Sequence, residues 1–156
     1  MSVSLELLGE ATAEVRGAVE IGLTEHAVAA GAPTRDVRAL SVIARDSSSK
    51  MVGALLGRTV WGWLHVKELW VDESHRHKGI GRKLMAAAEQ VAIERGCHGS
   101  YLDTFDFQSV PFYRQLGYST MGTLEDFPLG HTRFFLHKRL KSLAPPNNSL
   151  ERSRDP

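Results

Sequence analysis

Residues 69–85 read LWVDESHRHKGIGRKLM, and this stretch decides the fold. It begins with the apolar end of a strand-like segment and finishes in a helix that carries a regular apolar face. Between them lies a basic loop with two glycines, Gly79 and Gly81, whose backbone N–H groups an anion can approach closely. A hydrophobic strand that leads through such a loop into an amphipathic helix is the usual setting of a phosphate-binding turn.

The charges around this helix start favour a bound anion. Four formally charged cations and a histidine surround it: Arg76, His77, Lys78, Arg82 and Lys83. Because a helix N-terminus already carries partial positive charge, each added cation costs about 0.3 to 1 kcal/mol unless an anion is present. A solvated basic loop, whose glycines only permit a turn, is the alternative interpretation. Two common nucleotide motifs do not fit, since Leu84 takes the third glycine position of a dinucleotide fingerprint and the sequence contains no Gly-Lys-Ser/Thr.

Periodicity in the rest of the chain predicts the other elements. Alternating or apolar runs predict strands at Ser4–Leu8, Val37–Ala44, Met51–Val60, Trp63–Val71, Tyr101–Phe105, Tyr118–Leu124 and Arg133–Leu140. Helical spacing predicts the stretch Ala11–Ala30, split into two helices at Gly22, a long helix Gly79–Arg95, and a short helix capped by Ser109. This order predicts an α+β fold with a mixed, mostly antiparallel central sheet of about seven strands, flanking helices, and parallel fourth and fifth strands.

The composition is that of a globular chain. Of the 156 residues, 42% are hydrophobic and 24% charged, which we interpret as one domain, residues 1–140, followed by a disordered tail, residues 141–156. No apolar run approaches the roughly 20 residues of a spanning helix, and the N-terminus lacks the basic start of a signal peptide. The single cysteine, Cys97, is interpreted as a small buried core residue. These features predict a cytoplasmic protein.

Net charge and histidine spacing exclude other kinds of site. The formal net charge of +1 gives no global electrostatic reason to bind nucleic acid or an anionic membrane. His75 and His77 are two residues apart, but no third ligand stands nearby and the loop is cationic, so no metal site is predicted.

The Arg-x-x-Gly-x-Gly pattern of residues 76–81 resembles the signature of the GNAT superfamily of acyl-CoA-dependent N-acyltransferases. A second segment, PFYRQLGY at residues 111–118, is similar to the C-terminal motif of that family, and the resemblance covers about residues 3–140. It implies a GNAT-like fold in which the parallel strands splay apart to hold acetyl-CoA, the acyl donor substrate, with no metal. It also implies, as partners, coenzyme A and a small-molecule amine, with a homodimer as an open possibility.

The resemblance further implies which residues contact coenzyme A. The pyrophosphate is expected to be bound by the loop residues Arg76, His77, Lys78, Gly79, Ile80, Gly81 and Arg82. The pantetheine arm is expected to pair, like an added strand, with the main chain of Leu69, Trp70 and Val71. It is also expected to contact Ser109 and Phe112 near and within the second motif. Three positions depart from the family pattern: His77 stands where glycine is frequent, and Asp106 and Ser109 stand where many members carry Asn and Ala.

Acyl transfer from a thioester to an amine needs a proton for the leaving thiolate, stabilisation of an oxyanion, and a neutral amine. Tyr113 is similar to the family tyrosine that acts as general acid, the alternative being a packing tyrosine. The expected oxyanion donor is the backbone N–H of Val71, freed from the ladder by a bulge at the end of its strand.

The base is expected on the strand Trp63–Val71. His65 lies eleven residues before Arg76, an offset at which several family members carry Glu or His. Strand periodicity places His65, Lys67, Leu69 and Val71 on one face and Glu68 on the other, so His65 and Glu68 serve different faces unless a bulge intervenes. Water is the alternative base.

The leading hypothesis is an N-acetyltransferase that transfers an acetyl group from acetyl-CoA to a primary amine of a small molecule by direct attack in a ternary complex. Asp103 and Asp106 are candidates for holding the ammonium, or else ordinary solvated charges. The alternatives are a non-catalytic acyl-CoA-binding or sensing module and a protein or peptide N-acetyltransferase. The tail segment PPNNSLERSRDP, residues 145–156, resembles translated recombination-site sequence of integron cassettes, which slightly favours an antibiotic acceptor.

Overall fold

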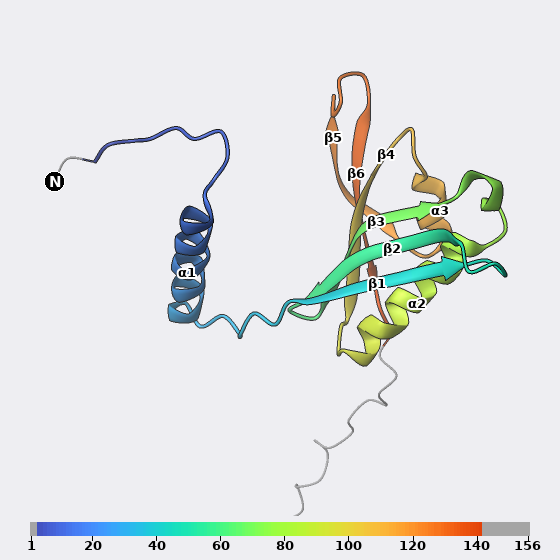
Figure 1. Cartoon of the computed structure of the whole chain (residues 1–156), viewed down its shortest axis with the longest axis horizontal. Coiled ribbons are helices and arrows are strands. Elements are labelled where there is room, and N and C mark those ends of the chain that lie inside the picture. Colours follow the sequence, from blue (N-terminus) through green and yellow to red (C-terminus); the bar gives the residue numbers. More distant parts are fainter. Residues whose placement is uncertain (1–2, 142–156) are drawn as a thin grey trace, which may run out of the picture. The chain divides into compact units, whose positions relative to one another are not determined.

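The computed structural model describes residues 3–141 (Figure 1). The chain forms two compact units, Met1–Arg35 and Asp36–Pro156. The predicted disordered tail and its integron-like segment lie, apart from Lys141, outside the described residues. The domain limits predicted at residues 1–140 stay a prediction.

The first unit contains one helix, α1 (Ala13–Ala29), whose N-terminus is capped by the Thr12 hydroxyl accepting a hydrogen bond from the Val15 N–H at 3.2 Å. The predicted division at Gly22 is wrong, because a single glycine costs only about 1 kcal/mol in a helix and does not break it. The predicted strand Ser4–Leu8 is also wrong: residues 3–8 form no regular element. Alternation alone does not make a strand, since a strand needs a neighbour for its hydrogen bonds.

The second unit is built on a sheet with the strand order β1-β2-β3-β4-β6-β5. Its strands are β1 (Arg38–Arg45), β2 (Met51–Val60), β3 (Trp63–Val71), β4 (Gly99–Phe105), β5 (Ser119–Glu125) and β6 (Thr132–Arg139). Its helices are a 3-10 turn (Glu73–His75), α2 (Ile80–Glu94) and α3 (Val110–Gln115). The predicted α+β fold is confirmed, but residues 3–141 form six strands rather than about seven, because the first predicted strand is missing.

The parallel pair in this sheet is short. β3 and β4 pair only over Trp63–His65 and Gly99–Tyr101, although both strands continue beyond these residues. The other neighbouring strands pair antiparallel along most of their length. The sheet is therefore split from within, and the predicted splaying of the parallel strands is confirmed.

A bulge interrupts β3 at Lys67. Leu56 of β2 pairs with Glu68 and the next residue, Gly57, pairs with Val66, so Lys67 has no partner in β2. Gly57 permits this close approach, because a Cβ there would lie 2.5 Å from the His65 carbonyl oxygen. The bulge is at Lys67 rather than at Val71, where it was expected.

The bulge also reverses the side-chain alternation along β3. Leu64 and Val66 pack into the core before it, and Leu69 and Val71 pack against the core after it. His65 and Glu68 therefore share the opposite face of the sheet, as their partners Arg58 and Leu56 do in β2. The prediction that His65 and Glu68 lie on different faces is wrong for this reason.

Helix α2 covers the face of β1–β3 that carries the core (Figure 1). Its buried residues, Leu84, Met85, Ala88 and Ala92, pack with Leu40, Leu55 and Leu64 of the sheet. Cys97 belongs to the same core, as predicted, and burial raises the pKa of its thiol. Within residues 3–141, no helix combines the length and apolar character that crossing a membrane would require.

Candidate active site

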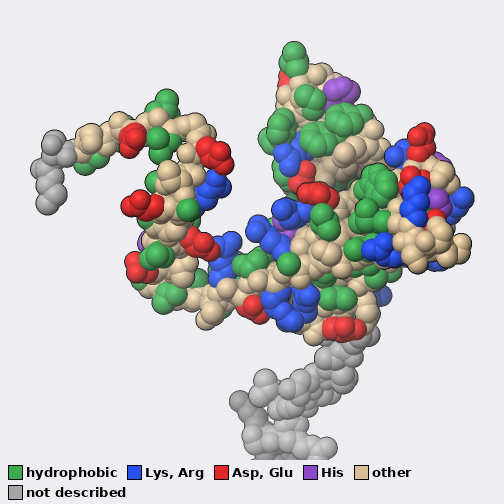
Figure 2. All heavy atoms as spheres, viewed as in Figure 1, with side chains coloured by type: hydrophobic (Ala, Val, Ile, Leu, Met, Phe, Trp, Pro, Cys, Tyr) green, Lys and Arg blue, Asp and Glu red, His purple; other side chains and the backbone are tan. Residues whose placement is uncertain are grey.

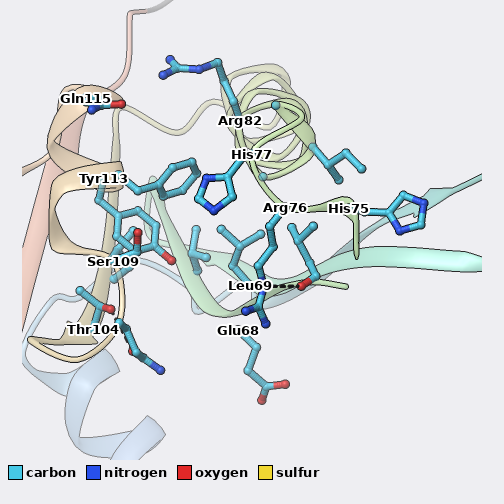
Figure 3. A pocket seen from close by; sticks show the side chains of 18 of the residues that line it. Glu68, Leu69, His75, Arg76, His77, Arg82, Thr104, Ser109, Tyr113 and Gln115 are labelled. Carbon is cyan, nitrogen blue, oxygen red and sulfur yellow. Dashed lines mark hydrogen bonds between the residues drawn. The ribbon is translucent and has the colours of Figure 1, made fainter. Parts of the chain in front are cut away.

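A slot of about 750 Å³ opens where β3 and β4 diverge. One wall comes from β3 and the loop into α2, and the other from β4 and α3. Figure 3 shows Ser109 and Tyr113 on one side of it and Leu69 and Arg76 on the other. All of the predicted site residues line this slot except His65, Trp70 and Lys78.

The β3 edge of the slot offers unpaired backbone groups. The Asp72 N–H donates to the Val52 carbonyl of β2 at 2.9 Å. Because hydrogen-bonding direction alternates along an antiparallel strand, the N–H and C=O of Trp70 also face β2, whereas those of Leu69 and Val71 face the slot. Of these, the Val71 carbonyl accepts a hydrogen bond from the Arg76 side chain. β4 pairs with β3 only as far as His65, so an extended ligand can bond to this edge as an added strand.

The start of α2 forms one end of the slot. The first N–H bonded within the helix is that of Lys83, which donates to the Gly79 carbonyl at 3.1 Å, so the N–H groups of Ile80, Gly81 and Arg82 are not used by the helix. No side chain caps this terminus and no acidic residue stands in its first turn. Gly79 takes the left-handed conformation with φ +77°, which its missing side chain allows. This end can bind an anion.

Basic side chains surround this end. Arg76, His77 and Arg82 line the slot, and the Arg76 Nε donates to the Val71 carbonyl at 3.2 Å, which fixes the arginine across the β3 edge. In Figure 2, Lys/Arg and His side chains gather on the part of the molecule where the loop between β3 and α2 lies. His77 has φ 58°, a backbone conformation that favours glycine.

Tyr113 reaches the slot from α3. It is buried, its ring contacts Phe112 and Tyr118 edge to face, and no group in residues 3–141 forms a hydrogen bond with its hydroxyl. Burial, and to a lesser extent the nearby Asp103 carboxylate, raise the pKa of this phenol to about 12. The hydroxyl is therefore protonated at any ordinary pH and can donate to an atom in the slot.

Phe112, rather than Ser109, connects this helix to the start of α2. Ser109 occupies the position before α3, but its hydroxyl makes no capping hydrogen bond, contrary to the prediction. Phe112 packs against the start of α2, where a Cβ added to Gly81 would lie 3.2 Å from its ring. Gly81 thus lets α3 approach the anion-binding end closely.

His65 lies at the closed end of the split, outside the slot lining. Its ring stacks on Tyr101 at 4.5 Å with an interplanar angle of 4°, and its Nδ1 is enclosed without a hydrogen-bond partner among the described residues. Burial, and then the charge of Arg58, lower the pKa of this imidazole, so His65 is mainly neutral near pH 7. Glu68, on the same face, does line the slot.

His75 takes part in the hydrogen bonds of the turn that follows β3. His75 Nδ1 lies 3.1 Å from Asp72 Oδ2, and hydrogen bonds from Ser74 and then His75 lower the pKa of Asp72 to about 2. This arrangement fixes the turn after β3. In the described part of the chain no three His, Cys, Asp or Glu side chains are grouped as metal ligands.

Several residues of the slot were missed from sequence. Leu102, Thr104 and Gln108 line the β4 side, where the Thr104 hydroxyl donates to Gln108 Oε1 at 2.9 Å and the Phe105 N–H donates to the same oxygen at 3.2 Å. Strand alternation could have revealed Leu102 and Thr104, because they lie two residues apart on β4 and therefore point to the same side of the sheet. Gln108 gave no such signal.

Comparison with known proteins identifies the family. The model of the Acetyltransferase (GNAT) family matches residues 16–118. A blasticidin-S acetyltransferase from Streptomyces morookaense is 40% identical over 112 residues, which are 69% of this chain and 82% of that protein.

Solved structures agree. A crystal structure of an acetyltransferase from Bacillus cereus ATCC 14579 has a TM-score of 0.77 and 31% identity, and the match covers 86% of this chain and 98% of that one. An aminoglycoside 6'-N-acetyltransferase complexed with coenzyme A shares the fold, with a TM-score of 0.60 and 20% identity over 69% of this chain and 76% of that one. The chain thus belongs to the GNAT family of acetyltransferases.

Proposed function

We propose that this acetyltransferase moves the acetyl group of acetyl-CoA to a primary amine of a small molecule, by direct attack in a ternary complex. The observation that carries the proposal is the continuous slot that joins an uncapped, basic helix start to an unpaired strand edge and a buried tyrosine. The first feature suits the pyrophosphate, the second the amide-containing pantetheine arm, and the third the thioester. An aminoglycoside 6'-N-acetyltransferase with the same fold was solved in complex with coenzyme A, which supports coenzyme A as the ligand proposed here.

Different residues of the slot assist the separate steps of acetyl transfer. The amine nitrogen forms a bond to the thioester carbonyl carbon, and the C–S bond then breaks to release coenzyme A as a thiolate or thiol. The Tyr113 hydroxyl donates a hydrogen bond to the sulfur as charge develops on it. The Val71 N–H, which faces the slot, donates to the carbonyl oxygen as it becomes an oxyanion.

The attacking amine must lose a proton. His65 is mainly neutral near pH 7 and can accept it, either directly or through a water molecule, because it lies at the closed end of the split. Glu68 lines the slot on the same face and is the competing base.

The name of one relative suggests a first acceptor. Because a protein that is 40% identical is a blasticidin-S acetyltransferase, we propose blasticidin S as the first amine to assay. A turnover assay that follows thiol release from acetyl-CoA, with mass spectrometry of the product, tests this acceptor against a panel of other small amines.

Binding of coenzyme A is tested without any acceptor. A ligand at about 100 times its dissociation constant adds roughly 2.7 kcal/mol to folding stability, so coenzyme A should raise the melting temperature. Arg82→Glu, which puts a negative charge at the anion-binding end, should abolish most of this increase. Lys83→Glu is the matched control, because Lys83 is the next residue of α2 and does not line the slot. An equal loss in both variants, or in neither, would contradict the assignment of the phosphate site.

A further inference from the structure

The carboxylates and the arginines that line the slot stand on different elements. Arg76 and Arg82 stand on the loop and helix at one end, while the two carboxylates, Glu68 and Asp103, stand on β3 and β4, where Lys67 of the bulge is the one further Lys or Arg of the lining. Asp103 pairs with Phe135 and lies two residues after Tyr101, which pairs with His65, so Asp103 shares the sheet face of His65 and Glu68, away from α2. The two arginines therefore favour an anionic donor at the loop end, and the two carboxylates offer partners to a cationic acceptor at the strands.

Asp103 is held so that one of its oxygens stays available. Arg133 contacts only Oδ2, with its Nε at 2.7 Å and its Nη2 at 2.6 Å. Among residues 3–141 no hydrogen bond to Oδ1 is formed. The Asp103 side chain is 26% exposed, so a ligand in the slot can reach it.

Arg133 is itself immobilised by aromatic rings. Its guanidinium carbon lies 4.9 Å from the ring centre of Phe127, 5.3 Å from that of Phe135 and 5.5 Å from that of Phe105. Such contacts stabilise the cation and limit its rotamers. The carboxylate of Asp103 is consequently fixed in direction before any substrate arrives, which lowers the entropy that binding would cost.

The other carboxylates on this side of the sheet are less suited to bind a cation. Asp106 uses both oxygens, Oδ1 with His131 Nδ1 at 3.0 Å and Oδ2 with the Thr132 N–H at 3.0 Å, and it does not line the slot. Glu68 lines the slot, but it is exposed and no described residue fixes its carboxylate. Of the two aspartates suggested by the sequence, the structure favours Asp103.

We propose that Asp103 Oδ1 binds the ammonium group of the acceptor, which makes the enzyme selective for amines that arrive as cations. This inference rests on the proposed function, because it takes the slot to be the place where donor and acceptor meet. Asp103 is in this view a specificity-determining residue, and Arg133 with its three phenylalanines is the support that positions it.

The kinetic test uses Asp103→Asn, which keeps the shape of the side chain and removes its charge. With blasticidin S as acceptor, KM should rise about tenfold or more, equivalent to ~1.4 kcal/mol, while kcat changes less and the coenzyme A thermal shift is retained. Glu125→Gln is the matched control, since Glu125 is an exposed carboxylate of β5 outside the slot lining. An equal KM in the two variants would overturn the proposal, and so would a loss confined to kcat.

A binding test separates this proposal from the proposed function. The coenzyme A-saturated protein, with ¹³C-labelled aspartate carboxyls, is titrated with n-propylammonium chloride and, as an ionic-strength control, with sodium chloride. The Asp103 resonance should shift saturably with the ammonium salt alone, and the saturable response should disappear in Asp103→Asn. Failure to see that shift overturns the Asp103 site even if turnover occurs. If the shift is seen and no amine is acetylated, the site stands and the proposed reaction fails.

Discussion

Replacing Tyr113 by Phe is the sharpest test of the proton-donor assignment. The substitution keeps the ring that packs against Phe112 and Tyr118 and removes a hydroxyl that has no hydrogen-bond partner among residues 3–141. Folding should therefore be almost unaffected, with a loss of less than about 1 kcal/mol, because no protein hydrogen bond is broken. Any large change in turnover then reports on chemistry in the slot.

The magnitude follows from the pKa of the phenol. The pKa of Tyr113 is raised to about 12, whereas a simple thiol has a pKa of about 8.5. Complete proton transfer to a free thiolate would be uphill by about 5 kcal/mol, so Tyr113 acts by donating a hydrogen bond while the C–S bond breaks. Positioned proton donors contribute about 10² to 10⁴ in rate. The unfavourable match places the expected fall in kcat near or below the low end of that range, about 10- to 100-fold.

The pH dependence gives a second, independent check. A group with its pKa near 12 stays protonated throughout an assay between pH 7 and 10, so the ratio of wild-type to variant kcat should be constant over that range. The assay follows thiol release at saturating acetyl-CoA and acceptor. Tyr101→Phe, which removes a hydroxyl outside the slot lining and keeps the ring stacked on His65, is the control and should retain kcat. Wild-type kcat in Tyr113→Phe, or a ratio that falls with a midpoint below pH 10, would refute the reasoning.

Three further substitutions test other features. If His65 is the base, kcat/KM should fall at low pH with a midpoint below the ordinary histidine pKa of 6.5, because burial lowers the pKa of its imidazole. His65→Gln should remove this acid limb of the pH profile. A limb lost only in Glu68→Gln would assign the base to Glu68 instead. His77→Gly should raise the urea-unfolding free energy by about 0.5 kcal/mol by relieving φ 58°, whereas Lys78→Gly should not stabilise. Gly57→Ala should cost more than about 2 kcal/mol, since its Cβ would meet the His65 carbonyl oxygen at 2.5 Å; Gly122→Ala on β5, with nothing within 4 Å, is the control in the same denaturant titration.

The glycine-containing, basic start of α2 could be predicted from sequence because its signals are local. The glycines, the cations and the apolar helical face all fall within residues 76–95, and the structure places Gly79 at the start of α2 as expected. The strand and helix limits from Arg38 to Arg139 likewise follow the periodicity within a few residues. In the first unit the same method failed at Ser4–Leu8, where alternation exists without a neighbouring strand.

The remaining errors come from interactions between distant residues. The bulge at Lys67 depends on how β3 pairs with β2. The residue that permits it, Gly57, lies on β2, so the sequence of β3 alone does not indicate the bulge. The contact of Asp103 with Arg133 joins residues thirty positions apart, so spacing along the chain could not reveal which aspartate stays available. Periodicity describes one element at a time, whereas these features belong to pairs of elements.

The unpaired Lys67 also constrains how the length of β3 can change. Removing Lys67 would restore regular alternation and would keep Leu64 and Val66 on the same face as Leu69 and Val71, because Val66 and Leu69 would then be two positions apart. Loss of Lys67 itself is therefore expected to disturb the core less than a single-residue deletion elsewhere in β3, which would move apolar side chains to the opposite face. Lys67 is the extra residue of the bulge, so its contribution is a local change in the course of β3 at the edge of the slot rather than the phase of the apolar pairs.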